Sequence, residues 1–358
     1  MGKKYCYSIS AYPALDHSLE QIELSLKVAA ALGASNVFTS YHLPEANYQA
    51  DEFVVKFNKF CELVEKYGLK LIIDVSGKSF KNLVVPKCIC ALRLDYGFTN
   101  EEIVNLSKSD DFAIELNASV LTIDKIEELI NLGLNVSNTR LSYNFYPKLY
   151  TGMDIFEVAS KNKILNSYGF HIMAYLPGVT FKREPLCEGL PSVESHRYMK
   201  PMYAATELLL TGVDEIGFGD PFVKLEELEE VKQAVEDFKN NIINVPLNVY
   251  SDVSSVEHEI LDGLHSLRLD EAPYMHRSSK GRGKAVLPRP TRNVNILDVT
   301  IDNELYKRYV GELGIARRPM PYNERVNIVG YIDQVYINLV NLLKPGYKFR
   351  FVKTVVNN

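Results

Sequence analysis

The stretch FHIMAYLPGVTFKREPLCEGLPSVESHR, residues 170–197, joins a strand-like run at 170–176 to a long loop rich in ionisable side chains. Loops between a strand and a helix are usually about two to six residues long, so this loop is too long and too charged for a simple connector. The next strand-like run, VDEIGFGDPF at 213–222, ends on glycines and Asp220. If the two strands are parallel neighbours, their carboxyl ends form one rim, where barrel enzymes carry their active sites.

The first 240 residues repeat this alternation of short apolar runs with longer amphipathic segments. The runs predicted to be strands are 5–10, 36–40, 70–75, 91–95, 112–117, 141–145, 170–176 and 215–218, and helical segments include 19–32, 51–67, 123–132 and 201–210. Eight consecutive units favour a closed (β/α)8 TIM barrel over an open sheet. After about residue 240, short alternating runs between polar turns predict a small, mostly β domain. We therefore predict a barrel domain at 1–242 and a β domain at 243–358.

Alternate residues of a strand face opposite sides of the sheet, so the pattern also predicts what lines the barrel. Arg93 and Asp95 would face the axis from the fourth strand, and Glu115 and Asn117 from the fifth. Buried charge is costly unless it is paired, and one interpretation is that Arg93 and Glu115 neutralise each other. Asp95 and Asn117 end their strands, where barrel enzymes carry their chemistry, so we expect both to contact substrate.

Composition excludes several classes of function. The 358 residues carry a net charge of -5 and have no long basic run, so binding to a nucleic-acid backbone is not expected. No apolar run of about 18 residues is present, which predicts no membrane span, and the first residues lack the apolar segment of a signal peptide. The five cysteines are odd in number and lack metal-type pairing. These features predict a cytoplasmic protein with reduced thiols.

Carboxylates dominate the predicted strand ends: Glu45, Asp74, Asp95, Glu188 and Asp220. Glycoside hydrolysis needs a pair of carboxyl groups, one protonated as acid and one ionised as nucleophile or base. The chain has more candidate carboxylates than the two catalytic roles require. A carboxylate that does not react would instead order a loop or contact a sugar hydroxyl.

Metal and cofactor motifs are missing from the sequence. Histidines such as His196 lack H-x-x-x-H or H-x-H spacing, so we predict no metal and keep His196 as a substrate contact. No P-loop or G-x-G-x-x-G follows a strand, so we predict no nucleotide cofactor.

Cations near the predicted rim offer contacts for a phosphate. Arg183 and Arg197 would meet it from the seventh loop, where many barrels bind phosphate, or would pair with Glu184 and Glu194 on the same loop. The basic segment MHRSSKGRGKAVLPRPTR at 275–292 contains Arg277 and Arg289. This segment is either a solvent-exposed loop or binds an anion above the mouth of the barrel.

Eight sequence segments together resemble the 6-phospho-N-acetylmuramidases, a bacterial family. They are FTSYHLPE (38–45), LRLDYGF (92–98), ELNAS (115–119), YNFYPKLYTG (143–152), PLCEGLPSVESHR (185–197), GFGDPF (217–222) and IDNELYKRYVGELGI with ERVNIVG (301–315, 324–330). The resemblance spans nearly the whole chain. It implies a barrel with a cyclophilin-like C-terminal β domain, and cytosolic hydrolysis of N-acetylmuramic acid 6-phosphate linked β-1,4 to N-acetylglucosamine, in cell-wall recycling.

One position departs from the pattern of that family. The seventh loop there usually reads closer to R-G-P-L-x-E-G-L-P, whereas Glu184 follows Arg183 in this chain. A negative charge therefore adjoins the expected phosphate ligand, so either Glu184 points away or Arg183 is not that ligand.

We interpret the chain as a glycosidase in which Asp95 and Glu188 act as the reacting carboxylates. Residues expected to order the sugar or water are Glu45, Asp74, Asn117, Asn144 and Asp220, and further substrate contacts are Arg183, His196, Arg197, Arg277 and Arg289. Alternatives are another barrel enzyme on phosphosugars, an isomerase or aldolase, and a non-enzymatic sugar-binding protein. The small domain would complete the active site or form a homo-oligomer.

Overall fold

The computed structural model describes residues 5–15, 17–41 and 50–357. The chain divides into two compact units, Met1–Val235 and Glu236–Asn358. The first unit is an α/β barrel and the second is mostly β, which confirms the predicted fold class. Glu45, one of the predicted carboxylates, lies outside the described residues.

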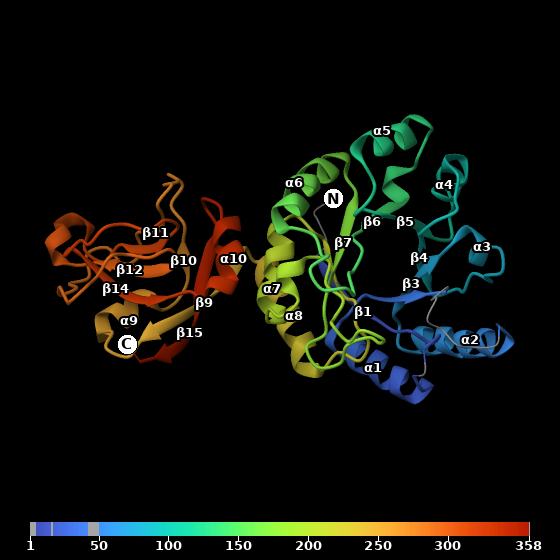
Figure 1. Ribbon diagram of the computed structural model, residues 1–358, viewed down its shortest axis with the longest axis horizontal. Coiled ribbons are helices and arrows are strands. Elements are labelled where there is room, and N and C mark those ends of the chain that lie inside the picture. Colours follow the sequence, from blue (N-terminus) through green and yellow to red (C-terminus); the bar gives the residue numbers. More distant parts are fainter. Residues whose placement is uncertain (1–4, 16, 42–49, 358) are drawn as a thin grey trace. The chain divides into compact units, whose positions relative to one another are not determined.

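The first unit is a closed barrel in which each strand pairs in parallel with the next and β8 pairs with β1 (Figure 1). Its strands are β1 (Cys6–Ser10), β2 (Asn36–Ser40), β3 (Lys70–Val75), β4 (Ile89–Leu94), β5 (Ala113–Asn117), β6 (Thr139–Ser142), β7 (His171–Leu176) and β8 (Glu215–Phe218). The helices are α1 (Leu19–Leu32), α2 (Ala50–Lys66), α3 (Gly77–Phe80), α4 (Asn100–Leu106), α5 (Ile123–Asn131), α6 (Ile155–Tyr168), α7 (Pro201–Leu210) and α8 (Leu225–Lys239), with short 3-10 helices η1 (Val136–Asn138) and η2 (Glu194–His196). Because parallel strands need a crossover that covers the sheet, the helices ring the barrel.

Local sequence signals set the ends of α1. Ser18 accepts a hydrogen bond from the backbone of Gln21, and the Gln21 side chain accepts one from Ser18, so the helix begins with a capping box. It ends at Gly33, whose φ of 91° is the left-handed conformation that glycine adopts without strain. Within the described residues, no helix is both long and apolar enough to cross a membrane.

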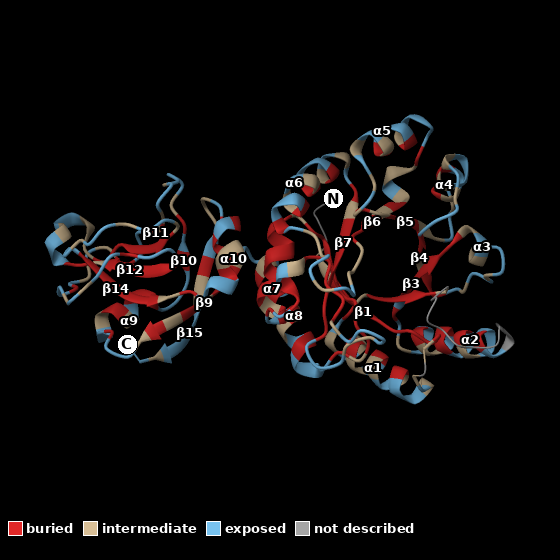
Figure 2. Cartoon of the chain, viewed as in Figure 1, coloured by how far each residue is buried: buried red, intermediate tan, exposed pale blue. Residues whose placement is uncertain are grey.

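The strands of the barrel are largely buried, as their colouring in Figure 2 shows. One buried cluster combines aromatic rings with smaller groups: Tyr12, Phe38, Ile72, Ala91, Met173 and Tyr175. Phe145 packs against this cluster, with its ring centroid 5.3 Å from that of Tyr175 in an edge-to-face arrangement. The barrel is therefore a packed core, and ligands must bind at its rims.

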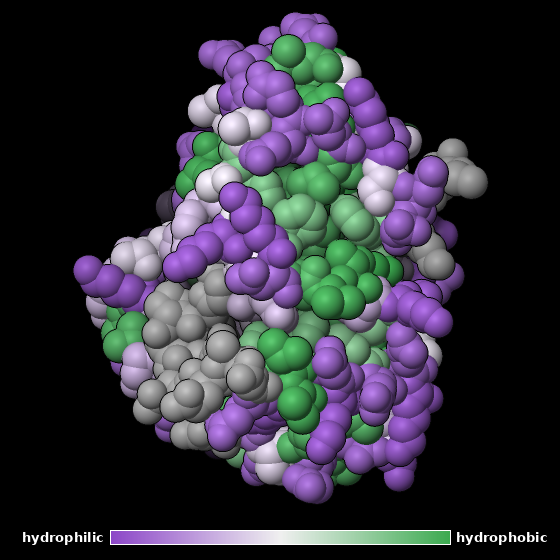
Figure 3. Space-filling model, turned by 90° about the vertical axis from the view of Figure 1, so that its right-hand side faces the viewer, coloured by the Kyte–Doolittle hydropathy of each residue, from purple (hydrophilic) through white to green (hydrophobic). Residues whose placement is uncertain are grey.

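Close backbone contact joins the loops that follow β3 and β4. The Gly77 N–H donates to the Tyr96 carbonyl at 2.8 Å, and a Cβ on Gly77 would lie 2.1 Å from the Gly97 carbonyl oxygen. Only glycine at position 77 lets the two loops approach so closely. A cavity of about 540 Å³ lies beside this contact and includes Phe80 and Phe98 in its lining. Figure 3 shows hydrophobic surface between hydrophilic side chains on the side of the barrel where Figure 1 places α2 to α4.

The second unit contains a seven-stranded sheet in the order β10-β15-β9-β14-β12-β13-β11. Its strands are β9 (Ile242–Tyr250), β10 (His265–Ser266), β11 (Met275–Ser278), β12 (Asp298–Asp302), β13 (Leu313–Ala316), β14 (Val326–Tyr331) and β15 (Lys348–Val356). Its helices are α9 (Ser255–Leu261) and α10 (Ile337–Leu342), with 3-10 helices η3 (Glu304–Tyr309) and η4 (Gln334–Tyr336). The strands pair antiparallel except for β15 with β9, which run parallel over nine residue pairs.

Candidate active site at the carboxyl rim of the barrel

Five neighbouring strands carry a row of ionisable side chains inside the barrel. Successive register partners are Asp74 of β3, Arg93 of β4, Glu115 of β5, Arg140 of β6 and His171 of β7, and acid alternates with base from Asp74 to Arg140. Because register partners on parallel strands face the same side, the predicted polar interior extends across strands as an alternation of acid and base. Each buried charge thereby has an opposite charge beside it.

The row divides into two groups, and the group at the carboxyl rim is centred on Arg93. Its Nη1 lies 2.6 Å from Asp74 Oδ1 and 3.5 Å from Asp95 Oδ1, and its Nε donates to Ser142 Oγ at 3.2 Å. Nη2 donates to Asn144 Oδ1. Burial alone would lower the pKa of Arg93, but Asp74, Tyr175 and Glu115 together raise the pKa above its ordinary value. One buried guanidinium therefore fixes three of the predicted site residues.

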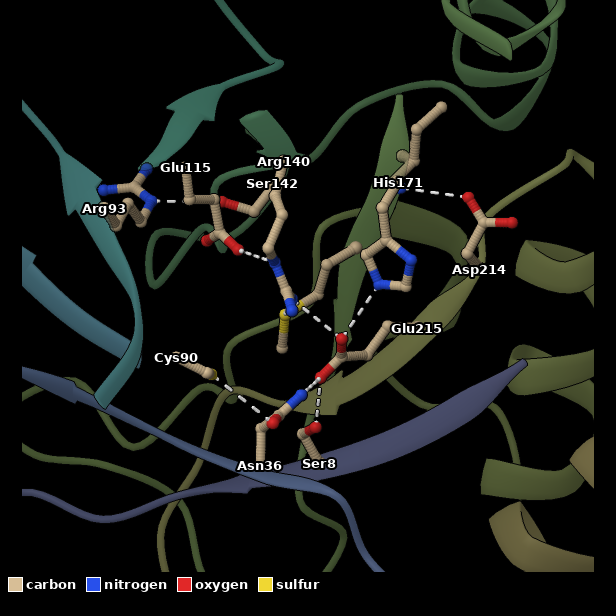
Figure 4. Close-up of polar contacts among 12 residues, drawn as sticks. Ser8, Asn36, Cys90, Arg93, Glu115, Arg140, Ser142, His171, Asp214 and Glu215 are labelled. Atoms are coloured by element: carbon tan, nitrogen blue, oxygen red, sulfur yellow. Dashed lines mark hydrogen bonds and ion pairs between the residues drawn. The ribbon is translucent and has the colours of Figure 1, made fainter. Parts of the chain in front are cut away.

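The second group lies nearer the amino ends of the strands (Figure 4). Glu215, which is fully buried, accepts from Arg140 Nη2 at 2.7 Å and contacts His171 Nε2 at 3.0 Å. Its other oxygen accepts from Ser8 Oγ and from Asn36 Nδ2. Burial alone would raise the pKa of Glu215, but Arg140 and these hydrogen bonds hold the pKa below its ordinary range.

The predicted pairing of Arg93 with Glu115 was wrong. The two residues are register partners, yet Arg93 bonds to Asp74, and Glu115 Oε2 accepts from Arg140 Nε at 3.2 Å. Arg93 and Glu115 each have an oppositely charged register partner on both neighbouring strands. Both side chains extend away from each other, Arg93 toward Asp74 and Glu115 toward Arg140. Arg93 is thereby directed to the carboxyl rim and Glu115 to the opposite group.

Cys6, His171 and Glu215 place one potential metal-ligand atom each within 4.8 Å of one another. Both carboxylate oxygens of Glu215 already accept hydrogen bonds, and the Arg140 guanidinium supplies a positive charge at 2.7 Å. A metal cation would have to displace or repel that charge. The contacts instead fit a charge-balanced part of the barrel core.

Arg183, in the loop after β7, is held by aromatic rings. Its guanidinium carbon lies 5.1 Å from the ring centroids of both Tyr12 and Phe145. Its Nη1 is buried and has no hydrogen-bond partner among the described residues. The neighbouring Glu184 is exposed and does not pair with it within the described part of the chain. Arg183 is therefore a fixed cation with an unfilled donor.

Arg197 belongs to the same loop but is buried and fully engaged. It forms a two-bond ion pair with Glu194, with both N–O distances at 2.7 Å. Its remaining donors reach the carbonyl oxygens of Glu188, Gly189, Tyr146 and Lys148. Arg197 and backbone N–H groups lower the pKa of Glu194 to about 2. These contacts fix the backbone at Glu188.

Two further loop residues, Asp220 and His196, are fully buried. Asp220 accepts from the backbone N–H groups of Gly178, Arg183 and Leu190 at 2.7–2.9 Å. Burial raises the pKa of Asp220 although these bonds oppose the shift. His196 Nε2 lies 2.9 Å from Glu207 Oε2 on α7. The geometry gives both residues a part in shaping the loop.

The remaining candidates lie at different places. Asn117 and Glu188 are half-buried, and Asn117 Oδ1 accepts from the Ser119 N–H. In the β unit, Arg277 pairs with Asp270 at 2.8 Å, while Arg289 pairs with Asp252 at 3.3 Å and donates to the Ile328 carbonyl.

Comparison with known proteins supplies the family. Residues 7–233 match the model of the 6-phospho-N-acetylmuramidase N-terminal domain, and residues 243–352 match that of its C-terminal domain. The chain belongs to this family. Membership makes it one of the muramidase-like glycosidases, which confirms the resemblance of its motifs. No curated protein matches the sequence.

Two crystal structures share the fold over nearly the full length. A conserved Enterococcus faecalis protein of unknown function is 27% identical, with 97% of this chain and 96% of that chain covered and a TM-score of 0.72. An uncharacterized B. cereus protein is 24% identical, with 98% and 99% covered and a TM-score of 0.82.

For this family member, sequence reasoning missed Tyr12, Phe145, Arg140 and Glu215. Arg140 lies two residues before Ser142, which binds Arg93 inside the barrel, and Glu215 lies two residues before Gly217. The alternation of strand residues could therefore have identified both. Tyr12 and Phe145 follow β1 and β6 in the sequence. No spacing rule indicates that their rings flank an arginine more than 35 residues away.

Proposed function

We propose that the protein hydrolyses the β-1,4 bond between N-acetylmuramic acid 6-phosphate and N-acetylglucosamine, in the cytoplasm and in cell-wall recycling. Family membership supports a glycosidase acting on a phosphorylated sugar. The observation that carries the proposal is the Arg93 cluster, which holds Asp95 at the carboxyl rim beside the more buried Asp74. Glycosidases need a pair of carboxyl groups, one acting as acid and the other as nucleophile or base, and Asp95 is proposed as one member of that pair.

Asp74 and Asp95 differ in exposure and in distance from Arg93. The Asp74 side chain is 11% exposed, lies 2.6 Å from Arg93 and also accepts from Ser40 Oγ. The Asp95 side chain is 32% exposed and lies 3.5 Å from the same nitrogen. The Asp74 carboxylate is thus more deeply buried in the protein, whereas the Asp95 carboxylate is more accessible to solvent. We assign Asp95 to the reaction and Asp74 to orientation and charge balance.

Glu188 is the proposed second reacting carboxylate. Arg197 holds the Glu188 carbonyl at 3.1 Å and the Gly189 carbonyl at 3.0 Å, so the main chain there is fixed while the Glu188 side chain remains half-buried. A fixed backbone carrying an accessible carboxyl group suits a reacting residue, because reactive geometry must be held closely.

The sugar phosphate is proposed to bind Arg183. A guanidinium stacked on aromatic rings keeps its full charge and offers paired N–H donors to phosphate oxygens. Arg183 meets this description, since Tyr12 and Phe145 flank it and its Nη1 has no partner among the described residues. Asn117 and Asn144 are proposed to contact sugar hydroxyls, and His196, Arg197 and Asp220 to shape the loop around them.

The decisive experiment compares hydrolysis of the phosphorylated and unphosphorylated disaccharides by the wild type, Asp95→Asn and Glu188→Gln. We expect cleavage of the phosphorylated form alone and a loss of turnover of about 100-fold or more in each variant. Glu184→Gln, which changes an exposed carboxylate on the same loop, is the matched control and should retain turnover. Near-normal activity in a folded Asp95→Asn or Glu188→Gln would remove that residue, and cleavage of neither disaccharide would reject the proposed function.

A further inference from the structure

The β unit contains a cavity of about 540 Å³ that is lined by residues of this unit. Its lining comes from β11 to β14, from η3 and from the segment 320–323. Buried Leu313, Val294 and Val326 contribute apolar surface, and Met275 and Met320 add flexible side chains. A cavity of this size that is mostly apolar with a few polar groups is typical of small-molecule sites.

Two carboxyl groups, Asp302 and Glu312, line this cavity in different states of pairing. Glu312 is buried, forms a close ion pair with Arg282, and lies 3.8 Å from Arg277 Nη1. The Asp302 carboxyl group has neither a hydrogen bond nor an ion pair within the part of the chain that the structure describes. Burial and the charge of Glu312 raise the pKa of Asp302 to about 7, although Arg282 opposes the shift. Asp302 is thus an unfilled acceptor that becomes a donor when protonated.

Arg277 lines the same cavity and carries an unfilled donor. Arg277 pairs with Asp270 through Nη2, but its Nε is buried and lacks a partner among the described residues. Leaving a buried polar group without a hydrogen-bond partner is unfavourable. A ligand that both donates and accepts hydrogen bonds would satisfy Asp302 and Arg277 together, and a hydroxyl group does both.

We propose that this cavity binds one ring of a neutral saccharide, with Asp302 and Arg277 bonding adjacent hydroxyl groups and the apolar lining contacting the C–H face of the ring. The proposal rests on the proposed function and extends it from cleavage to a second point of sugar recognition, built from residues of the β unit.

The charges around the cavity favour a neutral ligand over an ionic one. A cationic ligand would meet Arg277, while an anionic ligand would meet Glu312 and Asp302. One of the tyrosines in the lining, Tyr309, already contacts two cations, since the guanidinium carbons of Arg282 and Arg308 lie 4.9 and 4.8 Å from its ring centroid.

Methionine methyl groups give a site-resolved test in the full-length chain. Met275 and Met320 line the cavity, whereas Met173 is buried inside the barrel and reports on the other unit. With 13C-methyl methionine labelling and assignment by Met→Leu variants, N-acetylglucosamine would be titrated to about 20 mM, which detects millimolar dissociation constants. We expect saturable shifts of the Met275 and Met320 signals, and smaller shifts with glucosamine or glucuronate at equal concentration.

Two variants separate binding at the cavity from indirect effects. Asp302→Ala should weaken the sugar affinity reported by Met320 at least about tenfold, while Asp333→Ala, an exposed aspartate of the same unit, should leave it unchanged. The proposal is overturned if the Met275 and Met320 signals do not move, if Met173 alone responds, or if Asp302→Ala binds as the wild type does. A larger response to either charged sugar would overturn the assignment to a neutral ligand.

Discussion

Replacing Arg93 by Met tests whether the rim cluster is organised by charge. The Arg93 side chain is 7% exposed and lies 2.6 Å from Asp74, itself 11% exposed. Removing one partner of a buried pair leaves an uncompensated charge and typically costs about 3–5 kcal/mol. The lost bonds to Ser142 and Asn144 act in the same direction, while Asp95, being more exposed, adds little. We expect Arg93→Met to lower the free energy of unfolding by about 4 kcal/mol.

The double variant Asp74→Asn/Arg93→Met distinguishes charge from packing. Without the carboxylate no orphan charge remains, so about 2 kcal/mol of the lost stability should return relative to Arg93→Met. Urea unfolding followed by far-UV circular dichroism gives both values, provided that the m-value is unchanged. A loss below about 1 kcal/mol in Arg93→Met, or a double variant no more stable than the single one, would refute the reasoning. The double variant should remain inactive on the phosphorylated disaccharide, because Asp95 and Asn144 lose their shared anchor.

Three further predictions follow from individual contacts. Arg197→Lys cannot replace the forked bonds to Glu194 and the four carbonyls, so it should cost about 3 kcal/mol in urea unfolding and reduce turnover; unchanged turnover would show that the backbone at Glu188 does not need this anchor. Gly77→Ala should destabilise the protein by about 2 kcal/mol because its Cβ would meet the Gly97 carbonyl, and a Tm equal to that of the wild type would contradict the close contact. Folded Asp302 keeps its proton up to about pH 7 while the unfolded chain releases it near pH 3.8, so its contribution to stability is lost as pH rises through this interval. Asp302→Asn should abolish this pH-dependent loss of unfolding free energy, which amounts to at most about 4 kcal/mol above pH 7. If the unfolding free energies of variant and wild type changed in parallel with pH, the raised pKa of Asp302 would be contradicted.

The barrel was predictable because its strands carry a strong local signal. The predicted 36–40, 70–75 and 215–218 agree with β2, β3 and β8 to the residue. The prediction for β6, 141–145, was displaced from the observed Thr139–Ser142. The aromatic run at Tyr143 to Tyr146 resembles a strand, yet tertiary packing directs Phe145 onto Tyr175 and Arg183 at the rim. Burial against distant partners outweighed local β propensity there.

The site was predictable only in part. Strand alternation placed Arg93 and Asp95 inside the barrel, but Arg93 has acidic register partners on both sides, Asp74 and Glu115. Which of the two acids pairs with Arg93 depends on the direction in which the long arginine side chain extends. The spacing of residues in the sequence does not reveal this direction. Arg183 and Arg197 present the same difficulty, because both lie in one loop and the sequence suggests either as a phosphate ligand. Only the structure shows which of them already uses its hydrogen-bond donors within the protein.

Counting those donors separates the charges that build the rim from those left for a ligand. A loop of this length carries many backbone groups that need partners, and Arg197 and Asp220 satisfy several of them with buried side chains. Their charged groups are occupied by hydrogen bonds and ion pairs within the protein, so they are not available to a substrate. Arg183 contacts aromatic faces, which hold a cation in place without neutralising it. A cation restrained in this way suits recognition of a phosphate, because binding need neither break an existing ion pair nor immobilise a free side chain.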